Sequence, residues 1–149
     1  MSKLIAVPFA TTVHVRDTCL CLHVQRAARA LARRFDEALR PVDLTNGQFS
    51  VLMALNRPDP PTMGAVAALL AMDRTTLTAA LKVLERRLLL TITPDPADRR
   101  SRLLALTPAG LTLLARALPI WAQTHAALDE RLDEPGPAAL RSALQMIAR

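Results

Sequence analysis

Residues 73–93 read DRTTLTAALKVLERRLLLTIT, and residues 94–107 continue with PDPADRRSRLLALT. The first stretch opens on Asp73, and aspartate is among the preferred caps of a helix N-terminus. Apolar side chains then recur at the spacing that places them on one side of an α-helix. They are Leu77, Leu81, Leu84 and Leu88. The opposite side of this predicted helix is small, hydroxylated and basic, and it consists of Arg74, Thr75, Thr76, Thr78, Ala79 and Lys82.

A hairpin is predicted directly after this helix. Two short apolar segments, 88–93 and 103–106, lie on either side of a loop rich in Pro, Asp and Arg. The loop carries Arg99, Arg100 and Arg102. A capped helix followed at once by an arginine-tipped hairpin is the order of parts in a winged helix-turn-helix. We therefore predict a mainly α fold with a small β-hairpin wing, and DNA as the partner.

The N-terminal part is predicted to hold one long helix and two short ones. Residues 16–39 carry an amphipathic stripe, whereas residues 1–15 lack a helical period and are predicted to be an extended arm. Thr45 and Thr62 are suited to cap the two short helices, which a turn over residues 56–61 separates.

Two further helices are predicted after the hairpin. Thr107 followed by Pro108 marks a helix start, because proline suits the first helical position. This helix runs for several turns with a kink at Pro119, and the break over residues 135–137 precedes a final helix.

We predict a single domain, residues 1–149, in three parts. An arm and dimerisation helix (1–42) precede a DNA-binding unit (43–107), and C-terminal dimerisation helices (108–149) follow. The apolar stripes on the terminal helices exceed what one small central unit could cover. They are therefore expected to pack against a second copy of the chain.

Composition agrees with this scheme. The chain has 149 residues, 51% of them hydrophobic, and a formal net charge of +6. This size and apolar content suffice for one packed core, and the charge favours a polyanion such as nucleic acid as partner. Two cysteines, no secretory leader and no apolar stretch long enough to cross a membrane indicate a reduced, cytoplasmic setting.

The basic and hydroxylated residues have distinct expected roles on DNA. Threonine can bond a base or contact a thymine methyl, arginine can fork onto guanine, and lysine can neutralise a phosphate. The wing arginines suit a minor groove or a line of phosphates. Asp98, two residues before Arg100, is expected to accept a charge-assisted hydrogen bond from it and so fix the loop. An ordinary solvated helix face and a merely soluble turn remain the alternatives.

Four motifs in the central half of the chain resemble those of MarR family transcriptional regulators, in the same order and spacing. They are Leu44-Thr45-x-x-Gln48-Phe49-x-Val51-Leu52, Leu84-Glu85-Arg86-Arg87-x-Leu89, Asp98-Arg99-Arg100-Ser101-x-Leu103 and Leu106-Thr107-x-x-Gly110.

The resemblance implies a homodimer whose two winged units reach successive grooves of a pseudo-palindromic site in double-stranded DNA. Carried over by position, Thr62 and the helix from Asp73 contact DNA, Asp98 pairs with Arg100, and Arg99 or Arg100 enters the minor groove. Leu88 stands where the family usually has glycine, which adopts the left-handed conformation that ends a helix; leucine does so only at a cost of about 1 kcal/mol or more.

A second candidate site lies near the N-terminus. Organic-peroxide sensors of the family carry a reactive cysteine there, and Cys21 or Cys19 could be oxidised to sulfenic acid and so loosen the grip on DNA. Those sensors hold their thiol with tyrosines, and this chain has none. Arg16, His23 and Arg26 could instead meet a small aromatic or anionic ligand, or be plain surface residues.

The sequence thus predicts a homodimeric, sequence-specific DNA-binding regulator, a repressor released by a small ligand, with no cofactor, metal or membrane partner. A peroxide sensor using Cys21 is the first alternative. An enzyme using Cys21 and His23 is more remote, because no third orienting residue is evident. A helical module that dimerises without DNA would leave the arginine-rich hairpin without a role.

Overall fold

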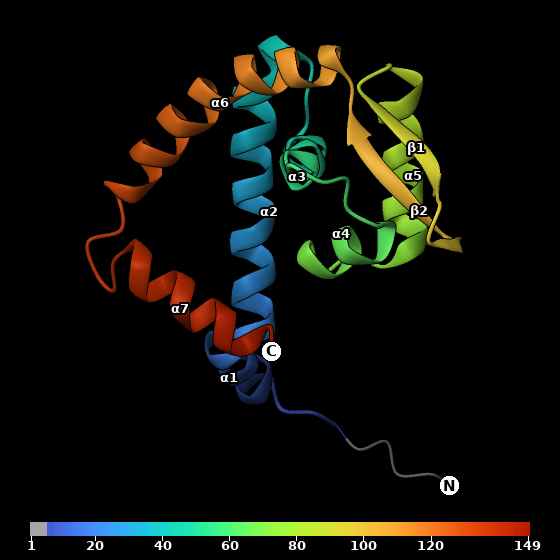
Figure 1. Cartoon of the computed structure of the whole chain (residues 1–149). Coiled ribbons are helices and arrows are strands. Elements are labelled where there is room, and N and C mark those ends of the chain that lie inside the picture. Colours follow the sequence, from blue (N-terminus) through green and yellow to red (C-terminus); the bar gives the residue numbers. More distant parts are fainter. Residues whose placement is uncertain (1–5) are drawn as a thin grey trace, which may run out of the picture. The chain divides into compact units, whose positions relative to one another are not determined.

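The computed structural model describes residues 6–149 (Figure 1). They form α1 (Phe9–Thr18), α2 (Leu20–Leu39), a 3-10 turn (Arg40–Val42), α3 (Asn46–Leu55), α4 (Met63–Leu69), α5 (Arg74–Arg86), β1 (Leu90–Asp95), β2 (Asp98–Leu106), α6 (Pro108–Asp129) and α7 (Pro137–Ile147). This is the mainly α fold with one β-hairpin that the sequence predicts. The chain divides into two compact units, with the boundary between Arg34 and Phe35.

The first unit differs from the predicted extended arm. From Phe9 onward the chain is helical, and residues 1–5 lie outside the described part. Pro8 had suggested an extended segment, yet it stands just before the first turn, where proline is tolerated. Its carbonyl accepts a hydrogen bond from the N–H of Thr11 at 3.0 Å. The arm prediction is therefore wrong over the end of its range.

The predicted continuous helix over residues 16–39 is also interrupted. Cys19 has φ −71° and ψ 108°, an extended conformation that separates α1 from α2. Just before it, the hydroxyl of Thr18 donates a 2.7 Å hydrogen bond to the carbonyl of His14. The same kind of bond occurs at Thr112 and Thr124 inside the unbroken α6, so this hydrogen bond alone does not explain the break.

Side-chain caps begin four helices of the second unit, at the positions predicted. Thr45 forms a capping box with Gln48, in which each side chain bonds the other residue's backbone N–H. Thr62, Asp73 and Thr107 each accept a hydrogen bond from the backbone N–H three residues later. Each cap accepts a hydrogen bond from an N–H group that has no partner within the helix. This fixes the residue at which the helix starts.

The axes of α4 and α5 make an angle of 109°. This lies in the range that is typical of a helix-turn-helix pair. The turn between them is closed by Ala71, which has φ 50°, and by a 2.9 Å bond from the N–H of Met72 to the carbonyl of Ala67. The tight turn holds the two helices in this crossed arrangement.

The end of α5 differs from the predicted apolar stripe at one residue. Leu77, Leu81 and Leu84 are buried on α5. Leu88 lies beyond the helix, has φ 60° and is 73% exposed. The N–H of Leu89 donates to the carbonyl of Leu84, which completes a Schellman-type helix end around Leu88. Leu88 thus adopts the left-handed conformation that glycine would favour.

The wing is a two-stranded antiparallel hairpin that starts with Leu90 opposite Leu106. Its second strand also pairs with the segment before α4. Thr62 forms an isolated bridge with Leu103, and the N–H of Leu104 donates to the carbonyl of Pro61 at 3.0 Å. The wing is therefore joined by backbone hydrogen bonds to the start of α4.

The core of the second unit is apolar, and no polar or charged residue among those described is buried. Its fully buried large side chains are Leu39, Val51, Leu52, Val66, Leu77, Leu81, Leu84, Leu90 and Leu104. These come from α2, α3, α4, α5 and both strands, so the hydrophobic effect holds the helix-turn-helix and the wing on one core.

After the wing, α6 contains Pro119 and runs unbroken from Pro108 to Asp129. The last helix, α7, buries none of its residues. No single helix among residues 6–149 is long and apolar enough to cross a membrane; α4 and α5 meet such a test only as a bent pair.

Candidate nucleic-acid interface

The outer side of α5 carries most of the residues predicted to read DNA. Arg74, Thr75, Thr76 and Lys82 are all exposed. Because Leu77, Leu81 and Leu84 anchor the opposite side in the core, the orientation of this face is set by packing and not by contacts among its own residues.

Asp73 orders the first turn of this face. Its carboxylate accepts the backbone N–H of Thr76 and also the Thr76 hydroxyl, both at 2.8 Å. The hydrogen bond from the Thr76 N–H, followed by that from its hydroxyl, lowers the pKa of Asp73 from its ordinary value. The Thr76 hydroxyl therefore donates its hydrogen bond to Asp73. Toward any other partner it can act only as an acceptor.

Two of the predicted threonines are less accessible than the rest of the face. Thr78 is half-buried, and its hydroxyl points to the sulfur of Met63 on α4 at 3.9 Å. Thr62 is half-buried as well, and its hydroxyl oxygen caps α4 by accepting the N–H of Ala65 at 3.1 Å. Both contribute to the joint between α4 and α5, and their contact with DNA stays a prediction.

Arg74 extends from α5 across the first turn of α4. A Cβ atom on Gly64 would lie 3.6 Å from Nη2 of Arg74, and 4.0 Å from the Thr62 hydroxyl oxygen. A Cβ at this distance would make an ordinary van der Waals contact, so the Arg74 guanidinium lies directly beside the backbone of Gly64. The starts of α4 and α5, where helix dipoles are positive, share one cationic surface.

The wing presents its arginines to solvent. Arg99, Arg100 and Arg102 are all exposed on β2. The register of the hairpin shifts between the pairs Pro94–Arg102 and Asp95–Asp98, so Arg99 and Arg100 lie in an irregular part of β2.

Two aspartates shape the wing tip. Asp95 Oδ1 accepts the N–H of Ala97 at 2.9 Å, and Asp98 Oδ1 accepts the N–H of Arg100 at 3.0 Å. The predicted partner of Asp98 was the Arg100 guanidinium. Within the described residues Asp98 bonds the backbone of Arg100 and forms no ion pair with its side chain. The predicted pairing therefore needs correction: a short Asx-type turn satisfies the carboxylate, and the guanidinium faces solvent.

Sequence reasoning identified Thr107 as the start of a helix but missed the contacts that Thr107 and Gly110 make at the base of the wing. The hydroxyl of Thr107 donates to the carbonyl of Leu88 at 2.6 Å and accepts the N–H of Gly110 at 3.0 Å. A Cβ atom on Gly110 would lie 2.0 Å from the carbonyl oxygen of Leu89. The two contacts bring the start of α6 against the segment that follows α5. In the sequence, their only signals are the glycine and the Thr-Pro pair.

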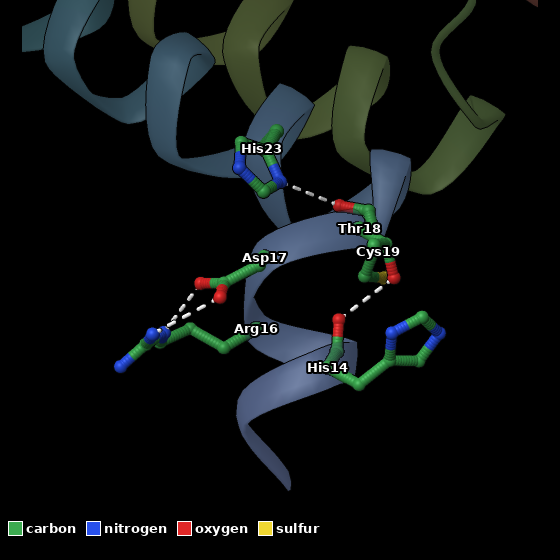
Figure 2. A network of polar contacts seen from close by, with 6 residues as sticks. All are labelled: His14, Arg16, Asp17, Thr18, Cys19 and His23. Atoms are coloured by element: carbon green, nitrogen blue, oxygen red, sulfur yellow. Dashed lines mark hydrogen bonds and ion pairs between the residues drawn. The ribbon is translucent and has the colours of Figure 1, made fainter. Parts of the chain in front are cut away.

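The second candidate site belongs to the first unit, and Figure 2 shows its polar contacts around the break at Cys19. Arg16 forms a two-pronged pair with Asp17, with Nε–Oδ1 at 2.7 Å and Nη2–Oδ2 at 3.1 Å, which raises the pKa of Arg16. The Nδ1 of His23 lies 2.8 Å from the carbonyl oxygen of Cys19 and must therefore donate to it. Two of the three predicted ligand contacts, Arg16 and His23, are thus already engaged within the chain.

Both cysteines are free, and Cys21 is the more accessible of the two. Its Sγ accepts a 3.3 Å hydrogen bond from the amide of Gln25. Arg26, the third predicted ligand contact, is exposed. No cluster of three or more metal-ligating side chains occurs in the part of the chain that the structure describes.

Comparison with known proteins gives the family. A sequence model of the MarR family matches residues 42–101. The transcriptional repressor CouR, solved on a 23-mer DNA duplex, is 36% identical with a TM-score of 0.80, over 91% of this chain and 96% of that one. BpsR of Bordetella bronchiseptica, whose structure concerns regulation of its DNA binding by 6-hydroxynicotinic acid, is 27% identical with a TM-score of 0.78, over 88% of this chain and 94% of that one.

Among curated sequences, the transcriptional repressor NicR of Pseudomonas putida is 34% identical over 76 residues. This alignment covers 51% of the present chain and 48% of NicR, so the match spans about half of that relative. The solved relative CouR is matched over nearly its full length and with the same winged helix-turn-helix architecture. The chain therefore belongs to the MarR family of transcriptional regulators.

Proposed function

We propose that the protein is a homodimeric, sequence-specific regulator that binds double-stranded DNA and represses transcription. The observation that carries this proposal is the pairing of two features in one compact unit: α4 and α5 cross at 109°, and the exposed basic face of α5 is followed by a wing with three exposed arginines. The family consists of DNA-binding regulators and not of enzymes, which removes the Cys21 and His23 enzyme from consideration.

The exposed face of α5 and the exposed wing arginines support the following division of labour on DNA. The α5 helix enters the major groove with its N-terminal turns foremost, so Arg74, Thr75 and Thr76 meet base edges and Lys82 meets a phosphate. The guanidiniums of Arg99, Arg100 and Arg102 reach the backbone or the adjacent minor groove. Residues 43–107 form the DNA-binding unit in this scheme.

Dimerisation is supported by apolar side chains that each unit leaves uncovered. On α7, Leu144, Met146 and Ile147 are 41%, 71% and 60% exposed, and on α1 Phe9 is 78% exposed. Exposed apolar surface on terminal helices is costly in a monomer, and a second copy related by twofold symmetry would bury it. The dimer would place two copies of α5 on successive grooves of a pseudo-palindromic operator in the cytoplasm.

Release by a small ligand is the finer part of the proposal. NicR is named a repressor, and BpsR is regulated by a small aromatic acid. A ligand releases DNA only if it binds the DNA-incompetent arrangement more tightly than the competent one. Arg16, His23 and Arg26 remain predicted anion contacts, although Asp17 already neutralises Arg16.

Sensing of organic peroxides by Cys21 is a second candidate, favoured by its exposure and by the Gln25 amide that bonds its sulfur. A hydroperoxide would oxidise the thiolate to sulfenic acid and leave as the alcohol. Cys21→Ser should bind DNA yet ignore a hydroperoxide, whereas Cys19→Ser should still respond. Equal responses of both variants would exclude Cys21 as the sensor.

The decisive experiment on DNA binding is a titration of the full chain with fragments from upstream of its own gene at several salt concentrations. We expect log K to fall linearly with log salt, by about 0.9 for each phosphate contacted. Light scattering on the same sample should give the mass of a dimer. A flat salt response, or tight binding by a monomer, would contradict the proposal.

A further inference from the structure

One face of α2 carries a row of positive charges. Arg26, Arg29 and Arg33 follow one another at intervals of three and four residues, which places them on the same side of the helix. All three are exposed, and none forms an ion pair with a described residue. We call them the α2 arginine stripe. Like charges at this spacing repel each other, so the stripe destabilises α2 unless an anionic partner covers it.

The first unit has no acidic side chain to balance the stripe. Residues 1–34 contain six Lys and Arg residues and one acidic residue, Asp17, which forms an ion pair with Arg16. The next two acidic residues along the chain are also engaged. Asp36 accepts the first backbone N–H of α3 at 2.7 Å, and Glu37 forms an ion pair with the arginine three residues later. The partner of the stripe must therefore come from elsewhere.

The complementary charge lies in the connection between α6 and α7 (Figure 1). Residues 129–134 read DERLDE, so four of the thirteen acidic residues of the chain fall within six positions. We call this segment the acidic turn. Glu130, Asp133 and Glu134 are exposed, and none forms an ion pair with a described residue. The acidic turn begins at the C-terminal end of α6, where the helix dipole is negative and a cation is favoured.

The stripe and the acidic turn match in length as well as in sign. Arg26 and Arg33 are seven residues apart on α2, which corresponds to about 10 Å at the rise of an α-helix. The backbone from Glu130 to Glu134 spans at most about 13 Å when extended. Several guanidinium groups can therefore meet several carboxylates at once, in the charge-assisted hydrogen bonds that both groups favour.

A second copy of the chain accounts for both segments. DNA would cover the arginines but would repel the acidic turn. Both segments also adjoin exposed apolar side chains of the terminal helices. Leu20, Val24 and Leu31 are exposed on α2, and Leu144 and Ile147 are exposed on α7, which follows the acidic turn. Charged residues around an apolar patch are the usual rim of a protein interface, so the stripe and the turn suit the edge of the proposed dimer contact.

We propose that the α2 arginine stripe of one copy binds the acidic turn of a second copy, and that this pairing selects a copy of this chain over chains without such a turn. Twofold symmetry would form the contact twice in each dimer. The inference rests on the homodimer of the proposed function and adds the basis of its specificity. A chain whose turn is neutral or basic would leave the stripe unpaired or would repel it.

The test mixes two charge-reversed variants of the full chain. One carries Arg29→Glu with Arg33→Glu, and the other carries Asp133→Lys with Glu134→Lys. Alone, each variant places like charges opposite each other, so its dimer dissociation constant should rise by about tenfold or more. In a heterodimer of the two variants, both contacts become complementary again. Native mass spectrometry of an equal mixture should therefore show heterodimer well above the roughly one half that random pairing of two chains gives.

The matched control is Arg57→Glu with Arg116→Glu, which reverses two exposed arginines outside both segments. It should dimerise as the parent protein does. Added salt should raise the dimer dissociation constant of the parent, and should raise that of the neutral variant Arg29→Gln with Arg33→Gln by a smaller factor. Glu and Gln suit a helix about as well as Arg does, so circular dichroism should show unchanged helix content in the α2 variants.

Random pairing in the mixture would overturn the proposal, even if each variant alone dimerises weakly, because the charges would then act within one chain. Variants that keep the dimer affinity of the parent and lose only affinity for DNA would assign the stripe to DNA, which also overturns it. A parent protein that stays monomeric at every concentration would contradict the proposed homodimer and the inference with it. A dimeric parent whose variants pair at random would contradict the inference alone.

Discussion

The α-carbon of Gly110 faces the carbonyl oxygen of Leu89 so closely that a Cβ atom at this position would lie 2.0 Å from that oxygen. Backbone, and not a flexible side chain, fills the space, so the start of α6 and the start of the wing can meet only through glycine. We expect Gly110→Ala to lower the free energy of unfolding by about 3 kcal/mol, the upper end of the usual cost of overpacking.

Urea unfolding measures this change, and Gly47→Ala is the matched control. A Cβ atom on Gly47 of α3 would have Thr45 Oγ1 as its nearest neighbour, at 3.9 Å. The control should shift stability by less than about 1 kcal/mol, in the stabilising direction. Similar losses of stability in both variants would mean that the contact with Leu89 is not the reason why glycine is required at position 110.

Leu88 offers the opposite test. It holds φ 60° with its side chain 73% exposed, so replacement by glycine removes strain and loses little packing. Leu88→Gly should raise the free energy of unfolding by about 1 kcal/mol. Ala79→Gly, within α5, should lower it by about the same amount. A lower free energy of unfolding in both variants would show that the Leu88 side chain contributes to stability.

Acid should weaken the cap of α5. The folded-state pKa of Asp73 lies below its ordinary value because the Thr76 N–H bonds the carboxylate, so the contribution of the cap is complete above the ordinary value and is lost as pH falls toward the folded-state pKa. Asn caps helices well without titrating. The stability difference between the parent and Asp73→Asn should therefore be constant near neutral pH and change in acid.

Unfolding by urea from pH 7 downward gives that difference. Asp59→Asn, in the turn before α4, is the control, since no helix is capped by Asp59. A difference for Asp73→Asn that does not vary with pH would contradict the assigned role of the carboxylate.

Arg100→Ala should weaken operator binding and reduce the slope of log K against log salt by about 1, because one phosphate contact is lost. The wing fold should persist, since Asp98 bonds the backbone of Arg100 and not its guanidinium. Gel shifts at several salt concentrations measure the slope, and light scattering measures the mass. Dissociation of the Arg100→Ala variant into monomers would show that Arg100 contributes to dimerisation.

Local signals made much of this fold predictable. The caps at Thr45, Thr62, Asp73 and Thr107 each depend on residues within one turn, and all four were located from sequence. Helical spacing likewise identified the buried side of α5. These are short-range properties, so neighbouring residues in the chain suffice to reveal them.

What the sequence could not reveal depends on contacts between distant segments or on backbone details. The pairing of Thr62 with Leu103 joins residues far apart in the chain. The sequence predicts the right partner residue for Asp98 but the wrong group. Opposite charges favour the Arg100 guanidinium, whereas in the tight turn the carboxylate accepts a hydrogen bond from the backbone N–H of Arg100. The break at Cys19 is a change in the backbone angles of one residue, and the apolar stripe continues at helical spacing on both sides of it.

The backbone bonds from Pro61 and Thr62 to β2 mean that the start of α4 and the wing cannot slide past each other without breaking hydrogen bonds. A displacement of α4 would therefore move α5 and the arginine-bearing hairpin together, as one unit. If the proposed function holds, such a unit would leave both grooves together, and release by an effector would be abrupt and not graded.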